Sequence, residues 1–293
     1  MKKLLTLFAV SIALLMLFGC SQSPTVNNSD TTDIGTMLQR PEFVELRPQA
    51  EVQVAIMQPA SMPSLDKKPT PPPPDPGGDD PNPNPAHKYA YIVGISDYEG
   101  TVNDLQYCDE DAVAMKSYLQ SQGFTVVMDL DGNATADNIT AGLQWLVNQA
   151  VPGDEVAFCY SGHGVKVQTY GSSIISTDLY YLTHGYVMQY FNAINCTKKT
   201  MTLDCCVIGD FHGDAEAGTM MATASTSSSS YDVPAFEHGA WTYFWLIAAE
   251  DLNKVYAEDI ASYAETQMKA WAKTYHLRAT PAHTDLYEGG FDI

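Results

Sequence analysis

The stretch Val156-Ala-Phe-Cys-Tyr-Ser-Gly-His-Gly164 decides how this chain is expected to fold. Residues 156–160 form a short apolar run, which is typical of a strand covered on both faces of a parallel sheet. The glycines on either side of His163 allow a sharp turn where the strand ends. Ligands bind beyond the carboxyl ends of strands in open α/β sheets, so we expect His163 at a binding edge. A histidine that merely caps a strand would give the same pattern.

A second stretch, Lys199-Thr-Met-Thr-Leu-Asp-Cys-Cys-Val-Ile-Gly209, repeats this arrangement. A short strand over residues 200–203 is followed by Asp204 and two cysteines. The intervening chain is long enough for one crossover, so two parallel strands should deliver His163 and Cys206 to the same edge. A cysteine and a histidine that meet in this way form the nucleophile–base pair of a thiol hydrolase.

Strand and helix patterns alternate along the rest of the chain from about residue 87. Apolar runs predict further strands at residues 89–95, 124–128 and 219–224. Apolar residues at helical spacing predict helices at residues 111–122, after Thr135, and at 185–193, 241–249 and 258–273. Such alternation predicts an α/β fold with a mainly parallel sheet that is covered on both faces.

Residues 1–20 have the features of an export signal. Two lysines precede an apolar core at residues 4–18, which is too short to span a bilayer. The core ends in Leu17-Phe18-Gly19-Cys20, which resembles a bacterial lipobox and implies a lipid-modified Cys20 that anchors the exported protein to the cell envelope. Ser21 is not the aspartate that favours inner-membrane retention, so the outer membrane or the cell surface is expected in a Gram-negative organism. An ordinary signal peptide with a chance cysteine is the alternative.

Residues 21–86 lack a clear helical period, and we interpret them as a flexible, proline-rich tether. The run PTPPPPDPGGDDPNPNP at residues 69–85 favours an extended, semi-rigid spacer. Alternating apolar residues between positions 43 and 56 could form one strand that docks on the domain. The composition becomes globular at His87, so residues 87–293 are expected to form one domain with a sizeable core.

Several of these motifs together resemble the caspase-like cysteine peptidases of family C14, and in particular their bacterial metacaspase-type members. The blocks Tyr160-Ser-Gly-His-Gly164 and Asp204-Cys-Cys-Val-Ile-Gly209 are similar to the two signature blocks of that family. Residues 91–98 resemble its first strand, residues 105–112 the start of its first helix, and residues 239–244 a block late in the domain. The resemblance implies a three-layer α-β-α sandwich around a mainly parallel sheet of about six strands.

The same resemblance implies a cysteine-type endopeptidase that uses a Cys-His dyad. His163 matches the catalytic histidine and Cys206 matches the nucleophile, whose thiolate is the reactive form. The backbone amides of Gly164 and Cys206 match the groups that hold the oxyanion.

The resemblance further implies a pocket for the residue before the scissile bond. Its lining would be Cys108, Asp111, Ser161 and Asp204. Two carboxylates in a small cavity favour a cation, which predicts peptide or protein substrates that are cleaved after Arg or Lys. Asp111 alone would also fit as an acid placed near a helix N-terminus.

The sequence departs from the family pattern just after the expected nucleophile. Ile208 stands where the family has a serine, and Val207 lies between Ile208 and Cys206. The loop from His163 to Asp178 is short and carries few charged residues. These departures leave open a catalytically weak or inactive caspase-fold lipoprotein that serves as a binding protein or scaffold.

Charge limits the expected partners. A net charge of −20 argues against nucleic acid and suits basic peptide substrates. No cofactor is expected to be required, although calcium could bind the acidic surplus through ligands that the sequence does not identify. Residues 129–133 resemble only part of a calcium loop, and Cys205, Cys206 and His212 lack the second pair of ligands typical of a zinc site.

The cysteine count also bears on the site. Lipidation of Cys20 would leave five cysteines, an odd number in an exported protein. One free thiol is therefore expected, and Cys206 is the natural choice. The remaining four could pair or stay reduced: Cys108, Cys159, Cys196 and Cys205.

Overall fold

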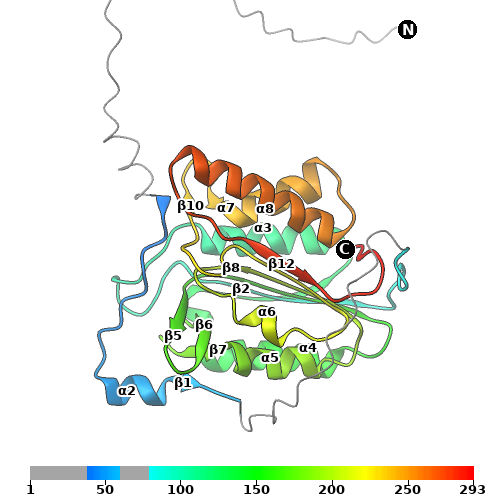
Figure 1. Cartoon of the computed structure of the whole chain (residues 1–293). Coiled ribbons are helices and arrows are strands. Elements are labelled where there is room, and N and C mark those ends of the chain that lie inside the picture. Colours follow the sequence, from blue (N-terminus) through cyan, green and yellow to red (C-terminus); the bar gives the residue numbers. More distant parts are fainter. Residues whose placement is uncertain (1–37, 60–78) are drawn as a thin grey trace, which may run out of the picture.

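The computed structural model describes residues 38–59 and 79–293 (Figure 1). The expected export signal, Cys20 and most of the proline-rich run lie outside the described residues. Within the described ranges, no helix is both long enough and apolar enough to cross a membrane.

A six-stranded sheet forms the middle layer of the domain (Figure 1). Its strand order is β12-β9-β8-β4-β2-β3, and all neighbouring pairs are parallel except β12 with β9. Every strand predicted from the sequence is present, and β12 is an additional edge strand. The bounds are β2 (Lys88–Gly94), β3 (Thr125–Leu130), β4 (Glu155–Ser161), β8 (Lys198–Asp204), β9 (Thr219–Thr223) and β12 (Ala282–Asp285).

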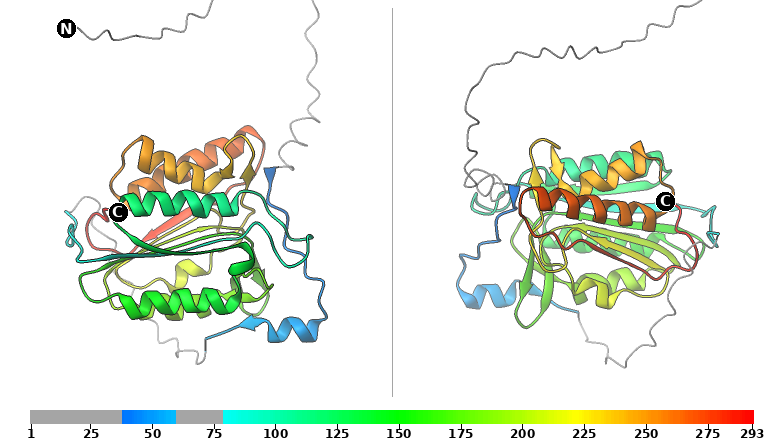
Figure 2. Two further views of the ribbon diagram at one scale, coloured as in Figure 1. Left: turned by 180° about the vertical axis from the view of Figure 1, so that it is seen from behind. Right: turned by 45° about the horizontal axis from the view of Figure 1, so that its top comes forward.

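Helices cover both faces of this sheet, as Figures 1 and 2 show. One face carries α3 (Cys108–Ser121), α7 (Ala240–Leu246) and α8 (Ala257–Thr274), and the other carries α4 (Ala136–Gln149) and α5 (His184–Ala193). Shorter pieces are the 3-10 turn Asp131–Asn133, α6 (Phe211–Asp214) and the π-helical turn Ile247–Asp251 that follows α7. The α/β sandwich expected from the sequence is therefore confirmed.

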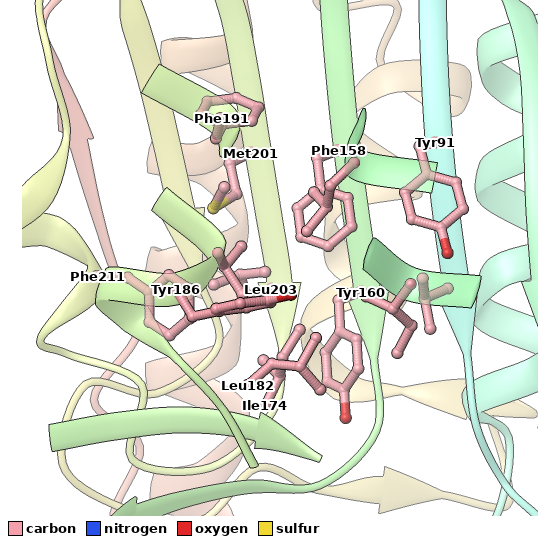
Figure 3. Close-up of a cluster of buried hydrophobic side chains, with 14 of the residues drawn as sticks. Tyr91, Phe158, Tyr160, Ile174, Leu182, Tyr186, Phe191, Met201, Leu203 and Phe211 are labelled. Atoms are coloured by element: carbon pink, nitrogen blue, oxygen red, sulfur yellow. The ribbon is translucent and has the colours of Figure 1, made fainter. Parts of the chain in front are cut away.

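Local sequence signals explain how α4 begins and how closely it packs. The Thr135 side chain accepts a hydrogen bond from the Asn138 amide at 3.3 Å and so caps the helix. Tyr91 and Phe158 stack under this helix with ring centroids 5.8 Å apart (Figure 3). A Cβ built on Gly142 would lie 2.1 Å from the Tyr91 ring, so the helix lies this close to the sheet only with glycine there.

A second, smaller sheet begins directly after His163. Its order is β1-β7-β6-β5, in which β5 (Gly164–Val167) and β6 (Gly171–Ile175) form an antiparallel hairpin. The hairpin continues into β7 (Tyr181–Thr183), which pairs with β6. A separate pair, β10 (Asp232–Val233) and β11 (His238–Gly239), precedes α7.

Residues 38–59, which the sequence analysis placed in the tether, lie against the domain. They contain α2 (Gln49–Val54) and β1 (Ile56–Met57), and β1 pairs in parallel with β7. The strand considered for positions 43–56 does not form, because the Pro48 carbonyl accepts hydrogen bonds from Glu51 and Val52 and starts a helical turn. Only the last apolar residues of that pattern reach a sheet.

Candidate active site

Two neighbouring strands bring His163 and Cys206 to one edge of the large sheet. In the register of β4 and β8, Ser161 lies opposite Asp204, and each expected catalytic residue follows two positions later. A Cβ built on Gly164 would lie 2.2 Å from the Cys206 carbonyl oxygen. The backbones of the two expected oxyanion-binding residues are thus in close contact, which glycine alone allows.

His163 is held firmly and is almost completely buried. Its amide donates to the Tyr98 hydroxyl at 2.8 Å, and its Nε2 lies 2.8 Å from the Asn103 carbonyl oxygen. A carbonyl only accepts, so Nε2 carries the proton and Nδ1 keeps its lone pair. Burial lowers the pKa of His163 to about 4, although the Asn103 carbonyl partly opposes this shift. The imidazole is therefore neutral near pH 7 and is able to accept a proton on Nδ1.

Cys206 is also mostly buried and hydrogen-bonded. Its Sγ accepts a hydrogen bond from the Ser230 amide at 3.1 Å, and 9% of the residue is exposed. Burial raises the pKa of Cys206, while the Ser230 amide and the Arg40 charge act in the opposite direction. Among the described residues, the structure records no hydrogen bond between Cys206 and His163. The pair is thus a neutral thiol beside a neutral imidazole.

The segment after Cys206 accommodates the two departures from the family pattern. Val207 has a φ of 46°, which is costly for a β-branched residue and needs support from its surroundings. That support comes from the Ser228 carbonyl, which accepts from the Val207 amide at 3.1 Å, and from the Ser172 hydroxyl, which donates to the Val207 carbonyl at 2.7 Å. Ile208 is fully buried in the core on the α4 and α5 side of the sheet.

The residues expected to line the pocket gather near Cys206. The Ser161 hydroxyl donates to Asp111 Oδ2 at 2.8 Å, and Cys108 is fully buried one turn before Asp111 on α3. The Asp204 carboxylate accepts from the Ser230 hydroxyl at 2.5 Å and from the Thr242 amide and hydroxyl at 3.0 Å each. The structure therefore collects all four residues around one small volume.

A guanidinium that the sequence analysis did not anticipate fills this volume. Arg40, from the segment before α2, is 1% exposed. Its Nε lies 2.7 Å from Asp232 Oδ1, and its terminal nitrogens lie 3.4 Å from carboxylate oxygens of Asp111 and Asp204. It also donates to the Ser161 hydroxyl at 3.2 Å and to the carbonyl of Asp204. Three carboxylates thus surround one arginine.

The electrostatics of the pocket favour a cation. Burial raises the pKa of Asp232 to about 6, and burial also raises the pKa of Asp111. Burial alone would disfavour the Arg40 charge, but Asp204 and Asp232 outweigh it and raise the pKa of Arg40. A Cβ built on Gly239 would lie 2.3 Å from Asp204 Oδ2 and 2.6 Å from Arg40 Nη2, so the pocket wall fits the guanidinium closely.

Arg40 and Asp232 are the site residues that sequence reasoning missed. Asp232 lies outside every motif, on the two-residue strand β10. Arg40 is followed by Pro41 in a segment interpreted as a tether, and only 15 Lys and Arg residues occur in the whole chain. The available signal was that the predicted pocket is acidic while the chain contains few arginines that could fill it.

The metal sites considered from the sequence do not assemble in the described part of the chain, where no group of three or more His, Cys, Asp or Glu side chains could hold an ion. Asp131 Oδ1 accepts from the Ser96 and Asp97 amides at 2.8 and 3.0 Å. Both ring nitrogens of His212 lie within 2.9 Å of threonine hydroxyls. These side chains therefore have structural partners.

All five cysteines in the described residues are free thiols. The alternatives left open for the other four are thus resolved in favour of unpaired side chains. Cys159 and Cys205 are buried in the two cores on opposite faces of the sheet.

A three-layer α/β domain that places a cysteine and a histidine at one edge of a parallel sheet, beside an acidic pocket, has the architecture of a caspase-type domain. Residues 87–280 match the family model of the caspase domain of peptidase family C14. The chain belongs to that family.

Curated relatives agree with this assignment, and a solved structure shares the fold. The chain is 36% identical to Metacaspase-2 of Trypanosoma brucei brucei over 95 residues. This match covers 29% of this chain and 27% of that protein. The chain is 39% identical to Metacaspase-1 of Debaryomyces hansenii over 87 residues. This match covers 26% of this chain and 20% of that protein. These matches span about a quarter of the length of each relative. Protein GSU0716 of Geobacter sulfurreducens shares the fold, with a TM-score of 0.56 at 14% identity over 71% of this chain and 97% of that chain.

Proposed function

We propose that this protein is a cysteine-type endopeptidase in which Cys206 and His163 form the catalytic dyad. The observation that carries the proposal is the close approach of the two strand ends, with Gly164 packed on the backbone of Cys206. Membership of the caspase-domain family supports the same activity.

The reaction begins from the neutral pair. The Cys206 thiol gives its proton to His163 Nδ1, and the sulfur attacks the carbonyl carbon of the substrate. The amides of Gly164 and Cys206 hold the negative oxygen. The carbon–nitrogen bond then breaks, the leaving amine takes the proton from His163, and water hydrolyses the thioester. No step needs a metal or a cofactor, and calcium enters the assay below only as a variable.

The proposed specificity is cleavage after arginine or lysine. Asp111, Asp204 and Asp232 converge on a guanidinium within 3.4 Å, and a substrate arginine would meet the same carboxylates. An aspartate before the scissile bond would add a fourth buried negative charge and would be rejected. Basic peptides also suit the net charge of −20.

Matched peptide reporters that differ only in a final Arg, Lys or Asp test the activity and the specificity together. The full chain should release product from the Arg and Lys reporters at least about tenfold faster than from the Asp reporter, since one unpaired buried charge costs more than 1.4 kcal/mol. Assays with and without calcium should agree. Cys206→Ala and His163→Ala should abolish release, whereas Cys196→Ala, a buried thiol just before the opposite end of β8, should retain it. Equal release in Cys206→Ala would contradict the dyad.

The attachment of the domain to the cell envelope through Cys20 belongs to the same proposal. It rests on the lipobox-like residues 17–20, which lie outside the described part of the chain. Membrane fractionation of cells that express the full chain or its Cys20→Ala variant tests it. The full chain should sediment with membranes and the variant should not; equal sedimentation would contradict lipid anchoring.

A further inference from the structure

The segment that carries Arg40 crosses the proposed active site along a defined path. Gln39 forms an antiparallel bridge with Tyr231, and the Arg40 amide donates to the Ser230 carbonyl at 3.0 Å. The amide of the same Ser230 donates to Cys206 Sγ. Ser230 therefore links the backbone of Arg40 to the sulfur of the proposed nucleophile through two hydrogen bonds.

The segment then passes to the histidine. The Phe43 ring lies 5.5 Å from the His163 ring, in an edge-to-face arrangement. Val44 exchanges two backbone hydrogen bonds with the side chain of Asn103, at 2.8 and 3.1 Å. The carbonyl of this Asn103 also accepts from His163. The chain thus runs from the cysteine side of the dyad to the histidine side.

This direction is the one that a substrate needs. The residue before the scissile bond has its side chain in the acidic pocket and its carbonyl near the sulfur, while the histidine lies beside the leaving amine. Arg40 takes the first position, and Pro41 to Phe43 take the positions that follow. The order of these contacts along the site is the order expected of a bound peptide.

We propose that residues 39–44 act as a built-in, substrate-like inhibitor, with Arg40 in the specificity pocket and Pro41 after the bond that would otherwise be cut. The inhibitory role rests on the peptidase function proposed above, whereas the covering of Cys206 does not. Proline lacks an amide hydrogen and fixes its own φ, and its ring restricts Arg40 to extended conformations. The extended Arg40 suits a bound peptide, while the ring on the leaving nitrogen should make the Arg40–Pro41 bond harder to cut than an ordinary amide.

The pocket is built to exchange this arginine for another cation. Its carboxylates keep neutral partners when Arg40 leaves: Asp111 accepts from Ser161 and the Gly239 amide, Asp204 from Ser230 and Thr242, and Asp232 from the Gln106 amide. Pro41, directly after Arg40, is exposed to solvent. A substrate arginine therefore competes with Arg40 for one site.

Access to Cys206 measures the covering without requiring catalysis. The full chain is treated with iodoacetamide, and alkylation of Cys206 is followed by peptide mass spectrometry, with Cys196, a buried thiol away from the pocket, as internal reference. Arg40→Ala should raise the rate at Cys206 at least about tenfold and leave the rate at Cys196 unchanged. Arg47→Ala is the matched control, because Arg47 lies on the same segment but pairs with Glu45 at 2.5 Å, away from the pocket.

An unchanged Cys206 rate in Arg40→Ala overturns the proposal, provided that circular dichroism shows a folded protein. If Arg40→Ala fails to fold, Phe43→Ala serves instead, since it keeps the pocket filled and removes the ring contacts with His163 and Tyr181. It should raise the Cys206 rate by a smaller factor, and no rise there also overturns the proposal. Faster alkylation without any peptidase turnover would support the covering and contradict the peptidase function.

The role of Pro41 has its own test. In the full-chain Pro41→Ala variant the resident bond becomes an ordinary amide, so Cys206 should cut it and release a fragment that ends at Arg40. Intact mass should then show a new amino terminus at position 41, and the double variant with Cys206→Ala should stay whole. A Pro41→Ala protein that stays whole while it hydrolyses an Arg reporter overturns the substrate-like placement, and cleavage of the unmodified chain at this bond overturns the role of the proline.

Discussion

Two cations are fully buried at opposite ends of strand β8, and each is surrounded by three carboxylates. At the carboxyl end, Arg40 meets Asp111, Asp204 and Asp232. At the amino end, Lys198 lies 2.7 Å from Asp80 and 3.4 Å from Glu155 and also pairs with Asp292. The side chains of both cations have no exposed surface. The two clusters have the same composition but a different construction.

The difference lies in which partner belongs to the sheet. Lys198 is part of β8 itself, and two of its carboxylates come from segments near the ends of the domain, Asp80 and Asp292. It ties these segments to the sheet. Arg40 instead lies on a segment before the caspase domain, whereas the three carboxylates that contact it lie on α3, β8 and β10. We propose that the first cluster is structural and that the second is a binding site that Arg40 occupies.

Removing the lysine should have the largest effect on stability. Lys198→Ala removes the cation beside Asp80 and Asp292 and leaves Glu155 with Lys88, 3.1 Å away, which should lower the free energy of unfolding by about 3–5 kcal/mol. Chemical denaturation of the full chain measures this. A smaller loss of unfolding free energy than in Arg40→Ala would contradict the distinction between a structural cluster and a binding site.

Removing the arginine should cost less and should be reversible by a ligand. Arg40→Ala should lower the free energy of unfolding by about 1–3 kcal/mol, because each carboxylate keeps a neutral donor. Benzamidine, a small amidinium cation, should restore up to about 2.7 kcal/mol at a hundred times its dissociation constant. It should give no such gain to Lys198→Ala, whose pocket for substrate is already filled by Arg40. Equal stabilisation of both variants would remove the basis for the comparison.

The smallest expected effect is on the pH dependence of that ligand. Burial raises the pKa of Asp232 to about 6 even though the Arg40 charge and hydrogen bond act to lower it, so this pKa should lie higher in Arg40→Ala. Benzamidine prefers the ionised carboxylate, and its affinity for Arg40→Ala should weaken by at most about tenfold per pH unit as the pH falls toward 6. Asp111 and His238, whose pKa values are also raised, face the same pocket. Asp232→Asn in the Arg40→Ala background should flatten most of the slope, and an unchanged slope would assign it to those two groups instead.

The sequence predicted the layers of the fold and the placement of His163 and Cys206 at one sheet edge because these depend on local patterns. Apolar runs and helical spacing marked β2, β4, β8 and the helices, and parallel pairing then placed His163 and Cys206 together. The family motifs identified Asp111 and Asp204 in the same way. Each of these residues lies on a regular element of the domain.

The remaining parts of the site depend on contacts between distant segments. Arg40 reaches a pocket whose carboxylates lie 71, 164 and 192 positions along the chain, and no periodic pattern encodes such pairing. The helix α2 was hidden because Pro48 starts it within an apparently alternating apolar run. Val207 and Ile208 departed from the family motif, yet the left-handed turn at Val207 and the core packing of Ile208 became visible only in three dimensions.

The most direct test of the account is the rate at which the full chain hydrolyses an Arg reporter with and without Arg40. At equal concentrations of folded protein, Arg40→Ala should have a kcat/KM at least about tenfold above that of the unmodified chain, and Arg47→Ala should match the unmodified chain. A kcat/KM that stays the same or falls in Arg40→Ala, while Cys206→Ala remains inactive, would contradict the claim that Arg40 occupies the substrate pocket.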